Sequence, residues 1–107
     1  MREDEFTPGE RPSGILLEQN YPNPFNPSTV IRYQLPVISF VTLKVYNILG
    51  EEIATLVNET QDEGQKTVLW NGSRFASGVY FYKLTAHQTE GRQAENFSET
   101  KRFVLLK

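Results

Sequence analysis

Residues 30–46 read VIRYQLPVISFVTLKVY and contain two runs in which apolar and polar side chains alternate. The apolar members are Ile31, Tyr33 and Leu35 in the first run, and Val41, Leu43 and Val45 in the second. Successive side chains of a strand point to opposite faces of a sheet, so an alternating run predicts a strand with one buried face. Each run therefore predicts a half-buried antiparallel strand whose polar side chains face water.

Similar short runs continue on both sides of this stretch. They predict strands at residues 15–18, 52–57, 68–70, 79–86 and 103–106. Gly50, Asn71-Gly72 and Ser77-Gly78 supply turn residues between them. Ile53 and Leu56 are three positions apart instead of two, which predicts a bulge in the strand that contains them.

The pattern as a whole predicts an all-β fold. No window keeps the apolar spacing of an amphipathic helix, so helix is expected to be minor or absent. About seven short strands with turns between them are typical of an immunoglobulin-like antiparallel β-sandwich. The chain has no cysteine and therefore no disulfide, so Trp70 and the other aromatic residues are expected to fill the core.

Length and composition exclude several classes of function. The 107 residues suffice for one domain, which we place at residues 15–107, and the charged, Pro- and Gly-containing residues 1–14 predict a flexible linker or tail. A net charge of −2 argues against non-specific nucleic-acid binding. The longest apolar runs, such as FVLL at residues 103–106, have four residues, whereas a membrane span needs roughly 20. Residues 1–6 lack the apolar region of a secretory signal, so export is expected to need a signal peptide upstream.

Residues 19–28 read QNYPNPFNPS, with three prolines in six positions. Proline fixes its own φ and favours extended geometry in the residue before it, so this segment predicts a stiff, extended crossover between strands. Tyr21 and Phe25 are its large apolar side chains, and both are expected to pin it to the sandwich. This structural role is favoured over that of a peptide ligand.

Five segments in register carry a resemblance to a known family. They are LEQNYPNPFNPST at residues 17–29, IRYQLP at 31–36, VYNILG at 45–50, ASGVYFYKL at 76–84 and KRFVLLK at 101–107. In this order they strongly resemble the type A C-terminal sorting domain of the bacterial type IX secretion system. They are also similar to the related Ig-like domain of flagellar hook-capping proteins.

The resemblance implies a non-catalytic sorting signal, here called an address, that is fused to the C-terminal side of a cargo domain. Cargo of such proteins crosses the inner membrane by a separate signal peptide, and the domain is then recognised at the outer-membrane translocon. A sortase-type peptidase removes the domain in many members, and the cargo is attached to the cell surface or released. The resemblance therefore implies a secreted or cell-surface location and cleavage within residues 1–14. It implies no cofactor, metal or nucleic acid, and we expect a monomer.

By the same resemblance the last seven residues are the candidates for translocon recognition. They are Lys101, Arg102, Phe103, Val104, Leu105, Leu106 and Lys107. A strand at a sheet edge offers unpaired backbone groups to which a receptor can add its own strand, and flanking cations discourage unwanted pairing. The residues alone leave open whether this segment is read by a receptor or only completes the core, and the resemblance favours recognition.

Catalytic and metal-binding sites are not predicted. His87 lies in a polar stretch and is expected to be a surface residue, and residues 87–100 predict a mobile hairpin extension. The pairs Glu51-Glu52 and Asp62-Glu63 lie at predicted turns, where no apolar surroundings raise a carboxyl pKa. Together with Glu59, the second pair is only a weak candidate for calcium.

Two other functions remain as alternatives to an address. In a carbohydrate-binding module, Tyr46, Phe81 and Tyr82 would form an exposed aromatic row. In a structural module of the hook-cap kind, the sandwich surfaces would contact copies of a partner. A paired aromatic core with an exposed basic final strand favours the address.

Overall fold

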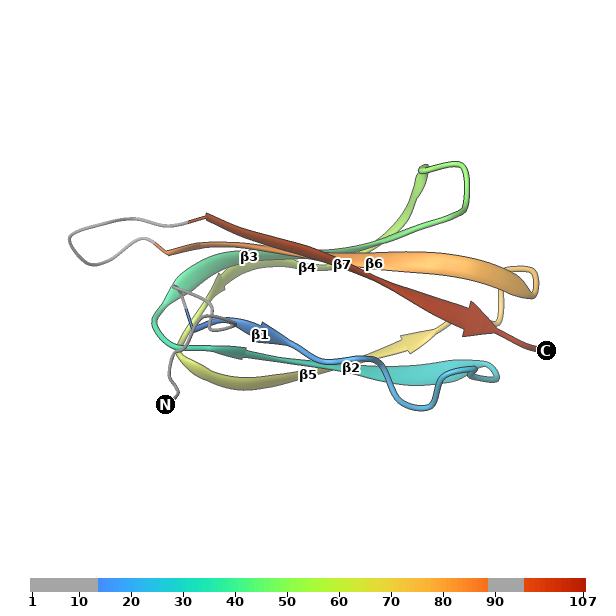
Figure 1. The fold of residues 1–107 in the computed structure, drawn as a ribbon, viewed down its shortest axis with the longest axis horizontal. Coiled ribbons are helices and arrows are strands. Elements are labelled where there is room, and N and C mark those ends of the chain that lie inside the picture. The colour runs from blue at the N-terminus through green and yellow to red at the C-terminus, as the bar shows by residue number, and fades with distance from the viewer. Residues whose placement is uncertain (1–13, 89–95) are drawn as a thin grey trace, which may run out of the picture.

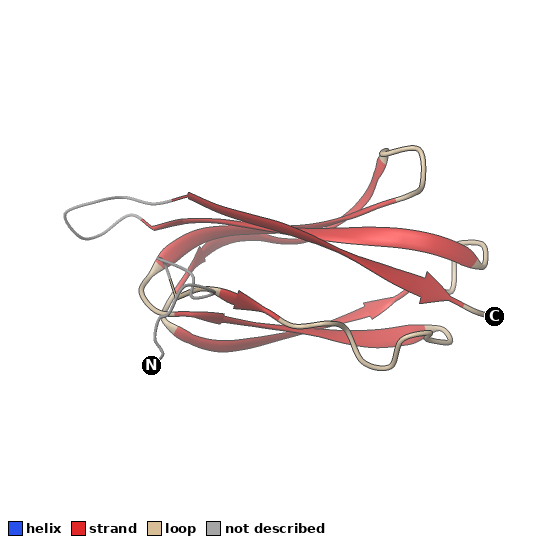
Figure 2. Ribbon diagram, in the orientation of Figure 1, coloured by secondary structure: helices blue, strands red, loops and turns tan. Residues whose placement is uncertain are grey.

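The computed structural model describes residues 14–88 and 96–107 and confirms the predicted all-β sandwich. It has seven strands and no helix within those residues, as Figures 1 and 2 show. The strands are β1 (Leu16–Leu17), β2 (Ser28–Leu35), β3 (Ser39–Tyr46), β4 (Glu52–Gln61), β5 (Gly64–Asn71), β6 (Gly78–Gln88) and β7 (Asn96–Leu105). The predicted tail, apart from Gly14, and residues 89–95 of the predicted extension lie outside the described residues.

The strands form two antiparallel sheets that face each other as layers (Figure 1). One sheet has the order β1-β2-β5 and the other the order β4-β3-β6-β7. The strand β7 therefore forms one edge of the four-stranded sheet, next to β6.

In the part of the chain that the structure describes, nothing helical is long and apolar enough to cross a membrane.

The two alternating runs place their apolar side chains between the layers, as predicted. Ile31, Tyr33 and Leu35 of β2 and Val41, Leu43 and Val45 of β3 are all buried. Trp70 lies among aromatic rings, with centroids 5.8 Å from Phe25 and 5.6 Å from Phe103. Aromatic packing thus occupies the centre of this disulfide-free core.

The turn and the bulge predicted around β4 are both present. Gly50 has φ +83°, a conformation that glycine adopts without steric cost, and its N–H donates to the carbonyl of Asn47. The pairing of β3 with β4 shifts register between Leu43 and Lys44 and again between Val45 and Tyr46. These shifts leave Leu56 and Ile53 of β4 without partners in the register, which explains their spacing of three.

The last strand is longer than the sequence predicts. We expected a strand at residues 103–106, whereas β7 begins at Asn96 and pairs with β6 without a register shift. Before Phe103, the inward positions of β7 are Phe97, Glu99 and Lys101, and the last two form an ion pair of 3.3 Å. Because two consecutive inward positions are charged, the apolar alternation that marks a half-buried strand is interrupted there.

One of the two expected anchors of the proline-rich segment is also corrected. Phe25 is buried and stacks on Phe103, with ring centroids 5.1 Å apart. Tyr21, in contrast, is 73% exposed, because it bridges to Val30 of β2 and Val30 lies on the outer face of its sheet. Phe25 alone therefore inserts the segment into the core.

Candidate functional site

The seven predicted recognition residues lie on the second half of β7 and in the two residues after it. Their side chains divide between the core and the surface. Phe103 and Leu105 are fully buried, Lys101 and Val104 are half-buried, and the exposed residues are Arg102, Leu106 and Lys107. The side chains that another molecule can contact are therefore all except Phe103 and Leu105.

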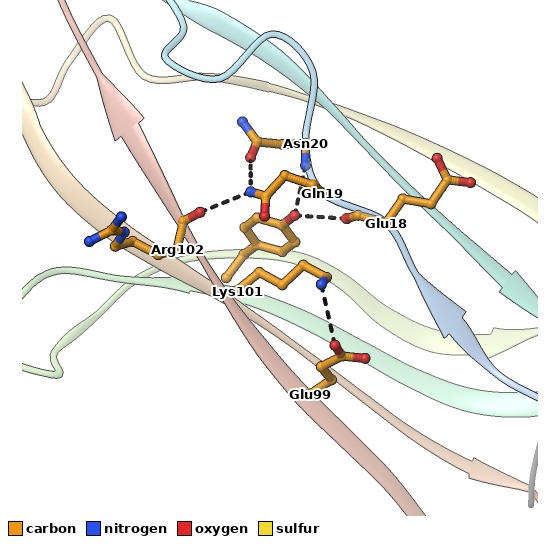
Figure 3. A network of polar contacts seen from close by, with 7 residues as sticks. Glu18, Gln19, Asn20, Glu99, Lys101 and Arg102 are labelled. Carbon is orange, nitrogen blue, oxygen red and sulfur yellow. Dashed lines mark hydrogen bonds and ion pairs between the residues drawn. The ribbon is translucent and has the colours of Figure 1, made fainter. Parts of the chain in front are cut away.

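The outward edge of this half of β7 is already occupied. The side chain of Gln19 donates to the carbonyl of Arg102 at 2.9 Å (Figure 3), and the N–H of Val104 donates to Asn23 Oδ1 at 3.0 Å. The N–H of Phe25 donates to the carbonyl of Val104, and the N–H of Leu106 donates to the carbonyl of Phe25, each at 2.9 Å. The expectation of unpaired backbone groups is therefore wrong for residues 102–106.

The proline-rich segment acts as a partial strand along this edge, which the sequence reasoning missed. An extended segment whose prolines lack N–H groups cannot lie inside a sheet, but its remaining groups can bond to an edge. The bridge between Phe25 and Leu105 is of this kind. The signal was present in the spacing of Pro22, Pro24 and Pro27, which leaves Phe25 with a free N–H between prolines.

The first half of β7 has an outward edge that no described residue pairs with through its backbone. Arg102 and Val104 direct backbone groups away from β6, and such residues alternate along an antiparallel strand. Because the register has no shift, Ser98 and Thr100 point the same way. None of the described residues forms a backbone hydrogen bond with them on that side.

A buried polar network holds the proline-rich segment against β6. The Tyr82 hydroxyl accepts from the N–H of Asn20 and donates to the carbonyl of Glu18, each at 2.8 Å (Figure 3). Asn20 Nδ2 donates to the Thr29 hydroxyl at 2.9 Å and to the carbonyl of Pro22 at 3.0 Å. Burial raises the pKa of Tyr82 to about 12, so this hydroxyl stays protonated as a donor at neutral pH.

The three basic residues of the predicted site have different surroundings. Lys101 pairs with Glu99. The Lys107 ammonium donates to the carbonyls of Ser73 and Phe75 at 2.8 and 2.9 Å, so it ties the chain end to the loop after β5. The Arg102 guanidinium has no ion-pair partner among the residues described and is the cation that this site presents to solvent.

The residues weighed for catalysis and metal binding are spread over the surface. His87 is exposed, with Nδ1 at 2.6 Å from Asn96 Oδ1. Hydrogen bonds from Thr55 and Lys44 lower the pKa of Glu52, which is opposite to the shift that a general acid needs. No group of three potential metal ligands occurs within residues 14–88 and 96–107.

The exposed aromatic row of a carbohydrate-binding module is not formed. Tyr82 is fully buried and meets Phe103 edge to face at a centroid distance of 4.9 Å. Tyr46 and Phe81 lie opposite each other on the outer face of the four-stranded sheet and are half-buried. The aromatic residues thus form mainly a paired core, which is the arrangement expected of an address domain.

Comparison with known proteins agrees with this arrangement. No curated protein and no solved structure gives a match to the chain. The secretion system C-terminal sorting domain matches residues 19–97, which include β2 to β6 and the proline-rich segment. The chain therefore belongs to the secretion system C-terminal sorting domain family, a family of sorting signals for type IX secretion that mark secreted and cell-surface proteins.

Proposed function

We propose that residues 15–107 are a non-catalytic address that the outer-membrane translocon reads on β7, and that residues 1–14 connect it to the cargo. The division of β7 into a bonded half and an open half carries this proposal. The open edge offers the backbone of Ser98 and Thr100 to a partner strand, and Arg102 adds a positive charge beside it. Recognition on such an edge is mostly through main-chain groups, so one translocon can serve many cargo proteins.

The bonded half prepares the strand for recognition. The four hydrogen bonds between residues 102–106 and Gln19, Asn23 and Phe25 hold this half of the strand in extended geometry before any partner arrives. Ordering a strand on binding costs conformational entropy, and a strand that is already ordered avoids that cost. The proline-rich segment thereby supports the open edge without covering it.

We further propose that a sortase-type peptidase cuts within residues 1–14, ahead of the first strand β1 (Leu16–Leu17). Attachment or release of the cargo follows that cleavage.

A proline scan of the open edge tests the proposal. A reporter with a signal peptide is fused ahead of residues 1–107 and expressed in a host with type IX secretion. Thr100→Pro removes an outward N–H without removing a hydrogen bond to β6, and its ring obstructs an added strand. We expect surface delivery to fall about tenfold, and Thr100→Val, which keeps the N–H, to leave it unchanged.

A stability control keeps this test specific for recognition. The purified Thr100→Pro domain must unfold at a denaturant concentration close to that of the unchanged domain. Deletion of residues 105–107 is less informative, because it removes the buried Leu105 side chain and weakens the core as well. Normal delivery of a stably folded Thr100→Pro fusion would exclude recognition through the open edge.

A further inference from the structure

The turn between β3 and β4 presents apolar side chains that have no packing role. Ile48 is 70% exposed and Leu49 is 77% exposed. Figure 1 shows this turn rising from the outer side of the four-stranded sheet. Exposed apolar groups gathered at one place on a surface commonly mark an interaction site.

The turn is also tightly built. Asn47 Oδ1 accepts from the N–H of Leu49 at 2.9 Å and from the N–H of Glu51 at 3.0 Å, and Asn47 Nδ2 donates to Glu51 Oε1 at 2.7 Å. Backbone bonds from Asn47 to Glu51 and from Gly50 to Asn47, each 3.0 Å, close the turn. These bonds order the backbone from which the two apolar side chains project, which lowers the entropic cost of binding a partner.

Beside the turn lies a hollow of about 310 Å³ on the outer face of the sheet. Tyr46 and Phe81 form its aromatic floor, because they are direct neighbours on β3 and β6. Ile48 of the turn and Lys83 and Thr100 of the neighbouring strands complete its walls. A hollow of this composition suits one apolar side chain of a partner.

The charged residue that lines the hollow is Lys83. Lys83 stands directly opposite Lys44, and like charges in that position repel each other. Lys44 is compensated by Glu52 at 3.2 Å, but Lys83 has no ion-pair partner among the described residues. Arg102 lies opposite Phe81 and is likewise uncompensated there. A carboxylate beside the bound apolar group would complement these charges.

We infer that this hollow binds an extended peptide segment that carries an apolar side chain and, two residues away, an aspartate or glutamate. Phe81 and Lys83 are two residues apart on β6, so their side chains leave the same face of the sheet about 7 Å apart. Side chains two positions apart in an extended peptide have the same separation and face the same side. The apolar group would enter between Tyr46, Phe81 and Ile48, while the carboxylate meets Lys83. The inference does not rest on the proposed secretion function.

Titration of the isotope-labelled 107-residue chain with short peptides tests the inference by NMR. The probe is acetyl-Leu-Thr-Glu-Thr-amide, which has the required spacing. The two comparison peptides are acetyl-Leu-Thr-Gln-Thr-amide, which lacks the charge, and acetyl-Leu-Glu-Thr-Thr-amide, which has the wrong spacing. We expect saturable shifts at Tyr46, Ile48, Phe81 and Lys83 with the probe, and about threefold weaker binding of both comparison peptides.

Variants then assign the contacts. Lys83→Gln should weaken the probe about threefold and leave the uncharged peptide unaffected, while Ile48→Ser should weaken all three peptides. Leu69→Ser is the matched control, because Leu69 is 67% exposed on the outer face of the other sheet. Equal affinities of the three peptides, shifts centred elsewhere, or no saturable shift up to about 10 mM would overturn the inference.

Discussion

The Tyr82 hydroxyl connects β6 to two residues that lie more than sixty positions earlier in the chain. Its ring is fully buried, and both of its hydrogen bonds are made to backbone groups of Glu18 and Asn20. Tyr33 on β2 of the three-stranded sheet is comparable, because its hydroxyl donates to Gln61 Oε1 on β4 of the four-stranded sheet. Both hydroxyls are protonated donors in the folded state, so the fold depends on their protonation.

High pH should therefore destabilise the domain. Burial raises the pKa of Tyr33 and of Tyr82 from 10.0 to about 12. The unfolded chain releases these protons more readily than the folded one, so the stabilising contribution is complete below pH 10 and is lost as the pH rises to about 12. An absorbance titration of tyrosinate should show two of the five tyrosines ionising late. Simultaneous ionisation of all five near pH 10 without unfolding would contradict this.

Removal of the Tyr82 hydroxyl alone tests the network. Tyr82→Phe keeps the ring but leaves the Glu18 carbonyl and the Asn20 N–H without this partner. Leaving buried polar groups unpaired costs roughly 1–3 kcal/mol, which urea denaturation should detect as a lower free energy of unfolding. Tyr46→Phe is the control, because Tyr46 lies on the outer face of its sheet, and it should change stability by less than about 0.5 kcal/mol.

Single residues could be predicted where their role depends on local pattern. Trp70 and the apolar members of the alternating runs are buried because a strand buries every second side chain. Tyr21 and Tyr82 were harder, because their exposure depends on which segment lies next to them in space. Tyr21 follows the outer face of β2, whereas Tyr82 lies beneath the proline-rich segment that bonds its hydroxyl.

At the scale of elements, β7 is the strand whose two halves behave differently. Residues 102–106 bond to the proline-rich segment, while residues 96–100 have an open outward edge among the residues described. The sequence could predict a final strand, because Phe103 and Leu105 alternate with polar or exposed residues. It could not predict which edge groups are bonded, because that depends on a segment about eighty residues away.

Hydrogen exchange should reveal this division amide by amide. The N–H groups of Val104 and Leu106 are bonded, so they should exchange slowly, whereas those of Ser98 and Thr100 should exchange quickly. Asn23→Ala removes the acceptor of the Val104 N–H and should speed its exchange about fivefold, because one hydrogen bond contributes roughly 1 kcal/mol. Asn26→Ala, in the same segment, should have no such effect. Slow exchange at Thr100 would mean that the edge is covered.

The whole molecule is held together by aromatic rings that reach from one sheet to the other. Trp70 extends from β5 of the three-stranded sheet to Phe103 and Tyr80 of the four-stranded sheet, and Phe25 adds the proline-rich segment to the same cluster. The two layers share one core, because no buried residue of either sheet belongs to a separate cluster in the described part of the chain. A single cooperative unfolding transition is the physical consequence.

Truncation of the central ring should weaken both sheets at once. Trp70→Ala removes contacts with Phe25, Phe75, Tyr80 and Phe103, and large-to-small changes of a buried aromatic residue cost roughly 3–5 kcal/mol. Since small domains are stable by only about 5–15 kcal/mol, a large fraction of the stability would be lost. In the unchanged domain, Trp70 fluorescence and far-ultraviolet circular dichroism should report the same denaturation midpoint. Leu69→Ala, the exposed neighbour on β5, should shift that midpoint little, and an equally small shift for Trp70→Ala would place the centre of the core elsewhere.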